Sequence, residues 1–208
     1  MIALTELQND AIVEIFNIGV GQAADTLSQM VLEHVSLSVP SVLFLTRKQA
    51  LETFNGDPTR RVCGVIQHFH GEFSTEAILM FPEEKSLELV RLAIGEQLPF
   101  EQMTDLEQEA MTEIGNIILN SCIGAMANLF QSEFHSGLPV FKVGSIAQIL
   151  RLTDDSPQHN PEDLVLMLLI NFGLERHDIS GYVTFILDVA SFNGLTTQID
   201  RFIGQIPQ

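Results

Sequence analysis

The chain has 208 residues, with 27 acidic and 10 basic side chains, and its net charge is −17 at pH 7 with histidine neutral. Hydrophobic residues make up 46% of the sequence and charged residues 18%, which is typical of a globular chain that can bury its own core. The negative charge argues against a nucleic-acid-binding groove, because a polyphosphate would be repelled, and it suits a partner protein with a basic patch.

Membrane insertion, secretion and disulfide bonding are not expected. The longest uninterrupted apolar run is Leu164–Ile170, whereas a membrane-spanning helix needs about 20 residues. The N-terminus lacks the basic segment and apolar stretch of a secretory signal. Cys63 and Cys122 lie in apolar surroundings, which favours buried free thiols over a disulfide. We therefore expect a cytoplasmic protein.

The first half of the chain alternates helical and strand patterns. Thr5 suits a helix N-cap, and apolar residues recur after it at helical spacing. Polar and apolar residues then alternate up to Pro40, which would end a strand. In chain order the expected elements are a helix over 5–33, a strand over 35–39, a short helix over 47–54, a turn over 55–58, paired strands over 61–69 and 74–81, and a helix over 82–95.

The second half repeats this order of elements. Thr104 or Asp105 would cap a second long helix, and Ser191 would cap the last helix. The expected elements are a helix over 105–130, a strand over 139–143, a short helix over 145–152, a polar loop over 153–162, strands over 164–172 and 179–187, and a helix over 191–204.

This repetition predicts an α+β fold with pseudo-two-fold symmetry, in which two long helices pack on a mostly antiparallel sheet. Each half is close to 100 residues long. The segment 96–102 joins the halves, and it is too short and too apolar for a free linker. We therefore expect residues 1–208 to form a single domain of two intertwined, homologous halves, about 1–98 and 99–208.

The two long helices also carry the same polar residues. The matched residues are Asp10, Glu14, Asn17 and Pro40 in the first copy, and Glu109, Glu113, Asn116 and Pro139 in the second. An offset of 99 relates the copies, and 22 residues separate each asparagine from its proline. The three helical positions of each copy lie within about 60° of one another, so they form one stripe. In the first helix this stripe lies opposite the apolar face, so Glu14 and Asn17 are expected to point outward.

A single glutamate and asparagine on a polar helix face would usually be solvated surface. Asparagine is also a mediocre helix former, so helix stability does not require it in the middle of a helix. Structural duplication alone would preserve core positions, but it would not particularly preserve an exposed asparagine. The matched copies therefore indicate a functional surface. Gly21 extends the first stripe and leaves it uncrowded, while Ile18 and Ile117 lie just beside the two stripes.

The pattern Asp/Ser-x3-Glu-x2-Asn-x22-Pro resembles the signature of the CheC phosphatases of bacterial and archaeal chemotaxis. The first copy matches the signature at every position. The second copy departs only at Glu109, which stands where the family has Asp or Ser. The chain length and the two copies resemble the CheC type, whereas CheX relatives carry one motif and FliY relatives add other domains.

The resemblance implies a hydrolase of two-component signalling that dephosphorylates the aspartyl phosphate of a CheY-type response regulator. Such hydrolysis needs a water held in line with the leaving carboxylate. A carboxamide can hold this water, because it both donates and accepts hydrogen bonds. Asn17 and Asn116 would enter the regulator's active site for this purpose, while Glu14 and Glu113 would pair with a regulator lysine.

The resemblance also implies supporting contacts to the partner. Asp10 would be a surface contact, and Glu109 would replace the family residue less well. Ile18, Gly21 and Ile117 would line the contact around the inserted asparagines. No metal or cofactor is expected to bind to this chain itself, because the phosphorylated regulator would supply the Mg²⁺.

Three other functions are alternatives to the phosphatase. His68 and His70 would place two imidazoles on one side of a strand, but no third metal ligand has a suitable spacing. A stronger alternative is an adaptor that binds a response regulator or the receptor deamidase CheD, which CheC proteins also bind, with little or no hydrolysis. A flagellar-motor scaffold is less favoured, because the sequence shows no second domain for that role.

Overall fold

The structure, a computed structural model, describes residues 4–31, 34–53, 61–94, 105–150, 164–174 and 177–205. Every strand pair within these residues is antiparallel, which confirms the expected mixture of helices and antiparallel sheet. The elements are α1 (Glu6–Val31), β1 (Val35–Thr46), α2 (Arg47–Thr53), β2 (Arg61–His70), β3 (Ser74–Pro82), α3 (Glu83–Ile94), α4 (Asp105–Phe130), β4 (His135–Ser136), β5 (Val140–Ser145), α5 (Ile146–Ile149), β6 (Leu164–Leu174), β7 (His177–Leu187) and α6 (Val189–Gln205).

The strands form one seven-stranded sheet in which the two halves of the chain are interleaved. Its order is β1-β6-β7-β3-β2-β4, and β5 also pairs with β2. Strand β1 of the first half thus pairs with β6 of the second, and β5 of the second half pairs with β2 of the first. The two pairings are equivalent: Ser41 lies opposite Leu169, and Val140, at the matching position in the second half, lies opposite Ile66.

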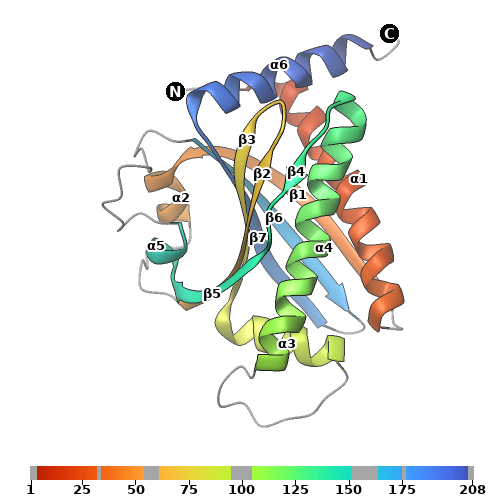
Figure 1. Cartoon of the computed structure of the whole chain (residues 1–208), viewed down its shortest axis with the longest axis vertical. Helices are drawn as coiled ribbons and strands as arrows, with labels where there is room; N and C mark the ends of the chain where they lie inside the picture. The colour runs from red at the N-terminus through yellow and green to blue at the C-terminus, as the bar shows by residue number, and fades with distance from the viewer. Residues whose placement is uncertain are drawn as a thin grey trace.

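Helices cover both faces of this sheet (Figure 1). Helices α1 and α4 lie side by side over one face, with α6 across their upper ends, while α2 and α5 lie on the opposite side. Successive residues of a strand point to opposite faces, so the central strands contribute to both layers. Val65, Leu79, Leu166 and Phe185 join the core beneath α1 and α4, and Ile66, Ile78, Val165 and Ile186 join the core beside α2 and α5.

Two glycines allow close packing around α1 and α4. A Cβ on Gly19 of α1 would lie 2.9 Å from the Cα of Cys122 in α4. A Cβ on Gly115 of α4 would lie 2.5 Å from the Cβ of Val65 in β2. Helix α4 therefore approaches β2 more closely at this point than any larger residue would permit.

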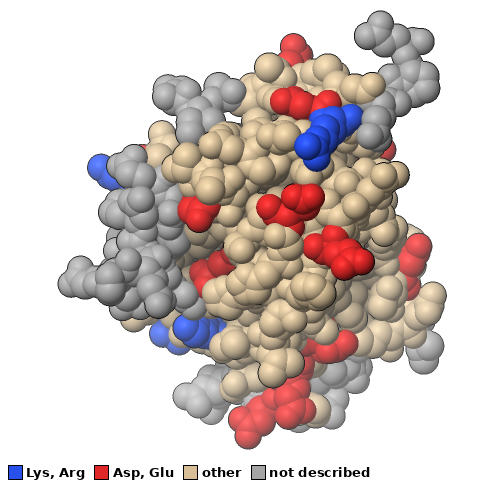
Figure 2. All heavy atoms as spheres, turned by 45° about the horizontal axis from the view of Figure 1, so that its top comes forward, with Lys and Arg blue, Asp and Glu red and all other residues tan. Residues whose placement is uncertain are grey.

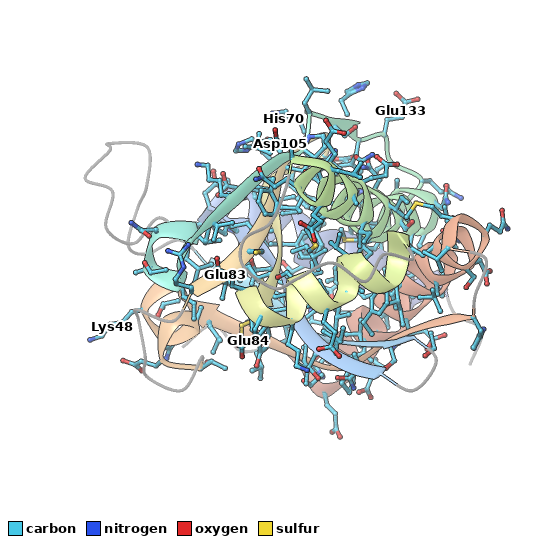
Figure 3. The ribbon with its side chains drawn as sticks, turned by 90° about the horizontal axis from the view of Figure 1, so that it is seen from below. Lys48, His70, Glu83, Glu84, Asp105 and Glu133 are labelled. Carbon is cyan, nitrogen blue, oxygen red and sulfur yellow. The ribbon has the colours of Figure 1, made fainter. Side chains whose placement is uncertain are left out.

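The surface is dominated by negative charge. Figure 2 shows acidic side chains spread over one face with few basic ones, as the net charge of −17 requires. Some of the carboxylates lie at helix starts: Glu83 and Glu84 in the first turn of α3, and Asp105 in that of α4 (Figure 3). Negative charge in these positions interacts favourably with the helix dipole.

The expectation that Pro40 ends the first strand is wrong. Strand β1 continues through Pro40 to Thr46, and its register with β6 shifts between Ser38 and Ser41. Proline is tolerated at such a bulge on an edge strand, because it removes no hydrogen bond that the sheet needs.

The start of the last helix also differs from the sequence prediction. Helix α6 begins at Val189, and the backbone N–H of Ser191 donates to Oδ1 of Asp188 at 2.7 Å. Asp188 therefore caps the helix, and Ser191 lies inside its first turn. The short strand β4 has too few residues for a periodic pattern. The predicted turn over 55–58, the connection over 96–102 and the loop over 153–162 lie outside the described residues.

Both cysteines are buried free thiols, as expected. Burial raises the pKa of the Cys63 thiol, and it raises the pKa of the Cys122 thiol to about 12. Across the described parts of the chain, no helix is both long enough and apolar enough to cross a membrane.

Candidate functional site

The signature residues lie on the adjacent helices α1 and α4. The four carboxylates, Asp10, Glu14, Glu109 and Glu113, are all exposed, which agrees with the outward orientation expected for Glu14. Of the apolar residues beside the stripes, Ile18 is exposed and Ile117 is half-buried. Gly21 is uncrowded, because a Cβ there would have no other group within 4 Å.

The first asparagine is bound to the protein's own backbone. Oδ1 of Asn17 accepts a hydrogen bond from the N–H of Val39 at 3.0 Å. Its Nδ2 donates to the carbonyl oxygen of Val39 at 3.2 Å and to that of Val13 at 2.9 Å. Because the bulge in β1 takes Val39 and Pro40 out of register with β6, Asn17 supplies partners that strand pairing does not.

A second side chain of α1 binds β1 in the same way. Oγ of Ser28 accepts from the N–H of Val35 at 2.9 Å and donates to the carbonyl oxygen of Ala24 at 2.7 Å. Because the carboxamide of Asn17 binds the backbone of β1 at Val39, the expectation that Asn17 points outward is wrong. Helical periodicity separates the apolar face of α1 from its polar face, but it cannot reveal that an edge strand lies along part of the polar face.

The second asparagine is held by side chains. Oδ1 of Asn116 accepts from Nδ2 of Asn120 at 2.7 Å and from Nε2 of Gln67 at 3.3 Å. In the described structure, Nδ2 of Asn116 forms no hydrogen bond within the chain. The amide donors of Asn116 are thus available to a partner, whereas those of Asn17 are occupied.

Gln67, Asn116 and Asn120 form a connected group, which we call the amide cluster. Oε1 of Gln67 accepts from Nδ2 of Asn120 at 3.3 Å, and Nε2 of Gln67 also donates to the carbonyl oxygen of Gly137 at 2.9 Å. Nδ2 of Asn120 donates as well to the carbonyl oxygen of Asn116 at 2.8 Å. Gln67 is only 1% exposed, so this cluster is anchored in the interior of the protein.

The chain beside the second asparagine is also more open. Leu138 occupies the position equivalent to Val39, yet Leu138 is 87% exposed whereas Val39 is 2% exposed. Strand β5 begins only at Val140, and among the described strands none binds Asn116 through its backbone in the way that Val39 binds Asn17. Leu138, Val140 and Val143 leave exposed apolar surface along this edge.

Sequence reasoning missed Gln67 and Leu138 as site residues. Gln67 is buried and directly follows the apolar run Val62–Ile66 of β2, so a polar residue at that alternating position could have drawn attention to it. The sequence pattern at Leu138 is that of an ordinary hydrophobic residue. Its exposure depends on the path of the chain between α4 and β5.

The two histidines of β2 have separate partners. Nε2 of His68 lies 3.3 Å from Oε2 of Glu76, and Nδ1 of His70 lies 3.3 Å from Oγ of Ser74. His70 is labelled in Figure 3. Within the described residues, no group of three or more His, Cys, Asp or Glu side chains could hold a metal ion.

Comparison with known proteins points to one family. The family model described as the CheC-like family matches residues 7–43, which include Glu14, Asn17 and Pro40. The chain is similar to "CheY-P phosphatase CheC" of Bacillus subtilis (strain 168), with 24% identity over 65% of this chain and 66% of that protein. The match thus spans slightly less than two thirds of that relative.

Solved structures with the same fold include two from this group of proteins. The crystal structure of Thermotoga maritima FliY matches with a TM-score of 0.77 and 18% identity, covering 97% of this chain and 100% of that one. The CheX chain in the CheX-CheY-BeF3-Mg+2 complex from Borrelia burgdorferi matches with a TM-score of 0.51 and 16% identity, covering 85% of this chain and 98% of that one.

The chain shares its antiparallel α+β fold with these proteins. The family model over residues 7–43, the named relative and the shared fold each show similarity to the CheC/CheX/FliY family, and they confirm the resemblance stated from the sequence.

Proposed function

We propose that the chain dephosphorylates the aspartyl phosphate of a CheY-type response regulator. The relative named as a CheY-P phosphatase supports this class of reaction. The single observation that carries the proposal is the state of Asn116, whose Nδ2 forms no hydrogen bond within the described chain and lies one helical turn from the exposed Glu113.

The available atoms indicate how this site would act. Both acceptor positions of Asn116 Oδ1 are taken by Gln67 and Asn120, so Asn116 has donors to offer. One N–H of Nδ2 would donate to one lone pair of the attacking water, leaving the other lone pair of that oxygen directed at phosphorus. Glu113 would pair with a regulator lysine and fix the pose. Catalysis would then come from positioning, which suits a phosphoryl group that is already activated in the regulator.

Neighbouring residues would complete the contact with the regulator. Glu109 and Ile117 lie on α4 with Asn116, Leu138 lies in the segment before β5, and Asp10 and Ile18 lie on α1. The Mg²⁺ in this proposal belongs to the phosphorylated regulator, which is the substrate. We also propose a cytoplasmic location for the protein, as expected from the sequence.

A binding role without hydrolysis is the second candidate, and one observation favours it for α1. The carboxamide of Asn17 is occupied by the backbone of β1, so it would have to leave Val39 before it could hold a water. Glu14 and Ile18 remain exposed beside it. The α1 surface would then dock a regulator, or the deamidase CheD, without using Asn17.

The proposal is tested by phosphate release from a phosphorylated CheY-type regulator with Mg²⁺, measured with and without this protein. We expect acceleration that falls to the uncatalysed rate in the double variant Asn17→Ala/Asn116→Ala. Asn116→Asp should lose most of the acceleration, because it keeps the shape of the side chain but removes the amide donors. Glu113→Gln should mainly weaken regulator binding.

Asn128→Ala is the matched control for these variants. Asn128 is an exposed asparagine of α4, about 18 Å along the helix from Asn116, and its substitution should leave the rate unchanged. Binding of the regulator without acceleration by the wild-type protein would favour the adaptor. Neither binding nor acceleration, across several regulators, would contradict the phosphatase and the regulator-binding adaptor, and absence of CheD binding as well would contradict the second candidate entirely.

A further inference from the structure

The two signature asparagines occupy equivalent positions but have different supports. Asn17 is held by the backbone of β1, and Asn116 is held by Gln67 and Asn120. This difference follows from residues outside the signature. It therefore identifies which further residues decide what each asparagine can do.

The pseudo-symmetry of the fold identifies the counterparts of Gln67 and Asn120. Ile66 and Leu169 are equivalent because they pair with equivalent strand positions, so the next residues, Gln67 and Ile170, are equivalent as well. Asn120 corresponds to Gly21 through the offset of 99 between the long helices. Neither Ile170 nor Gly21 has a side chain that can hydrogen-bond to Asn17.

The packing of α4 on β2 makes the cluster geometrically feasible. Gly115, which precedes Asn116, lies against Val65 of β2. The equivalent first-half position is Phe16, whose ring stacks on that of Phe185 at a centroid distance of 5.1 Å and fills the space between helix and sheet. The absence of a side chain on Gly115 lets α4 come close enough to β2 for Gln67 to reach Asn116.

The cluster also fixes which end of the Asn116 carboxamide faces outward. Oδ1 is met by two N–H donors, one from Gln67 and one from Asn120. A half-turn of the carboxamide would bring Nδ2 against the same two donors, replacing two hydrogen bonds with two donor–donor contacts. Oδ1 therefore stays inside, and the Nδ2 donors remain on the open side.

We propose that Gln67 and Asn120 are positioning residues of the second site, which hold Oδ1 of Asn116 so that its Nδ2 donors are presented to the regulator in one orientation. This inference rests on the proposed function. A side chain ordered in advance loses less entropy when the transition state forms, so the effect belongs in kcat rather than in regulator binding.

Two variants that copy the first half test this inference. In Gln67→Ile and Asn120→Gly, each new residue is the type found at the equivalent position of the other half, Ile170 and Gly21 respectively. We expect each variant to lower kcat for regulator dephosphorylation by about tenfold or more, with affinity for the beryllofluoride-activated regulator kept within about twofold. Thr184→Val, which removes a buried polar group from β7, and Asn128→Gly, which adds a glycine to α4, are the matched controls and should keep kcat.

A second readout does not depend on activity. The side-chain amide resonances of Asn116, assigned by their loss in Asn116→Asp, should show restricted motion on the picosecond-to-nanosecond timescale in the wild-type protein. In Gln67→Ile and Asn120→Gly the same amide should become mobile. The controls should leave its mobility unchanged.

The outcomes separate the inference from the function on which it rests. If the wild-type protein does not accelerate phosphate release, the proposed function fails, and the mobility of the Asn116 amide still decides whether Gln67 and Asn120 hold it. If Asn116→Ala abolishes acceleration while Gln67→Ile and Asn120→Gly keep kcat within about twofold, the positioning role is overturned and the phosphatase stands.

Discussion

At the scale of single residues, Asn17 and Asn116 share a signature and differ in what their carboxamides do. Asn17 satisfies backbone groups of a bulged strand, and its distance of 22 residues from Val39 explains why the motif couples asparagine to the following proline. Pro40 has no N–H of its own, so the bulge leaves one donor fewer to satisfy. In the first half, the motif thus has a structural role beside any contact with a partner.

Asn17→Ala should lower the free energy of unfolding by about 1–3 kcal/mol, because the N–H of Val39 would be buried without an acceptor. Asn116→Ala should cost less than about 1 kcal/mol, since Gln67 and Asn120 keep backbone carbonyl acceptors. Urea denaturation of both variants checks this difference. Equal losses would show that Asn17 is no more structural than Asn116.

The thiol of Cys122 predicts a pH dependence of stability. Burial raises its pKa from 9.0 to about 12, so the unfolded chain loses this proton first as the pH rises. The neutral Cys122 thiol's contribution to the free energy of unfolding is fully present below pH 9. Above pH 9 this contribution should fall by about 1.4 kcal/mol per pH unit until the folded pKa is reached. The stability advantage of the wild-type protein over Cys122→Ala should therefore shrink as the pH is raised above 9. Parallel pH profiles would contradict burial of the neutral thiol.

At the scale of elements, the fit between α4 and β2 depends on Gly115. The polar part of the second site is assembled across this contact, because Asn116 lies on the helix and Gln67 on the strand. The first-half residue equivalent to Gly115 is Phe16, whose ring packs between α1 and the sheet, whereas Gly115 lets Val65 of β2 pack directly against α4. The packing between helix and sheet beside the motif therefore differs between the two halves.

Gly115→Ala should lower the free energy of unfolding by about 1–3 kcal/mol, because its Cβ would overlap Val65 and push α4 away from β2. Gly124→Ala in the same helix is the control: its Cβ would meet nothing within 4 Å, and the better helix propensity should add up to about 1 kcal/mol. Thermal or urea denaturation measures both changes. A neutral Gly115→Ala would mean that the contact relaxes freely.

At the scale of the whole molecule, the two halves share one sheet by exchanging strands. Strand β1 completes the second half by pairing with β6, and β5 completes the first half by pairing with β2. Each half alone would expose an unpaired strand edge and half of the core between the sheet and the two long helices.

Residues 1–98 and 99–208 expressed separately should therefore fail to fold. Mixed or co-expressed, they should associate into one complex that unfolds in a single cooperative transition. Circular dichroism of each half and of the mixture, with size-exclusion chromatography, checks this expectation. A stable monomeric fold for either half would contradict the single-domain organisation predicted for residues 1–208.

The fold class, the two long helices and the doubled signature could be predicted from the sequence alone. These features are local: helical and strand periodicity, capping residues and fixed spacings can all be read along the chain. The exposed position of Glu14 follows from the same periodicity. So does the burial of Cys63 and Cys122, because both lie within apolar runs.

How the two asparagines are held depends on tertiary contacts that the sequence does not reveal. The partner of Asn17 depends on a bulge in an edge strand, and one of the two partners of Asn116 is a buried glutamine 49 residues away along the chain. Such contacts depend on strand register and on the distance between helix and sheet, which a small residue such as Gly115 sets. Side-chain periodicity carries no information on either quantity, so one doubled motif in the sequence became two different sites in the fold.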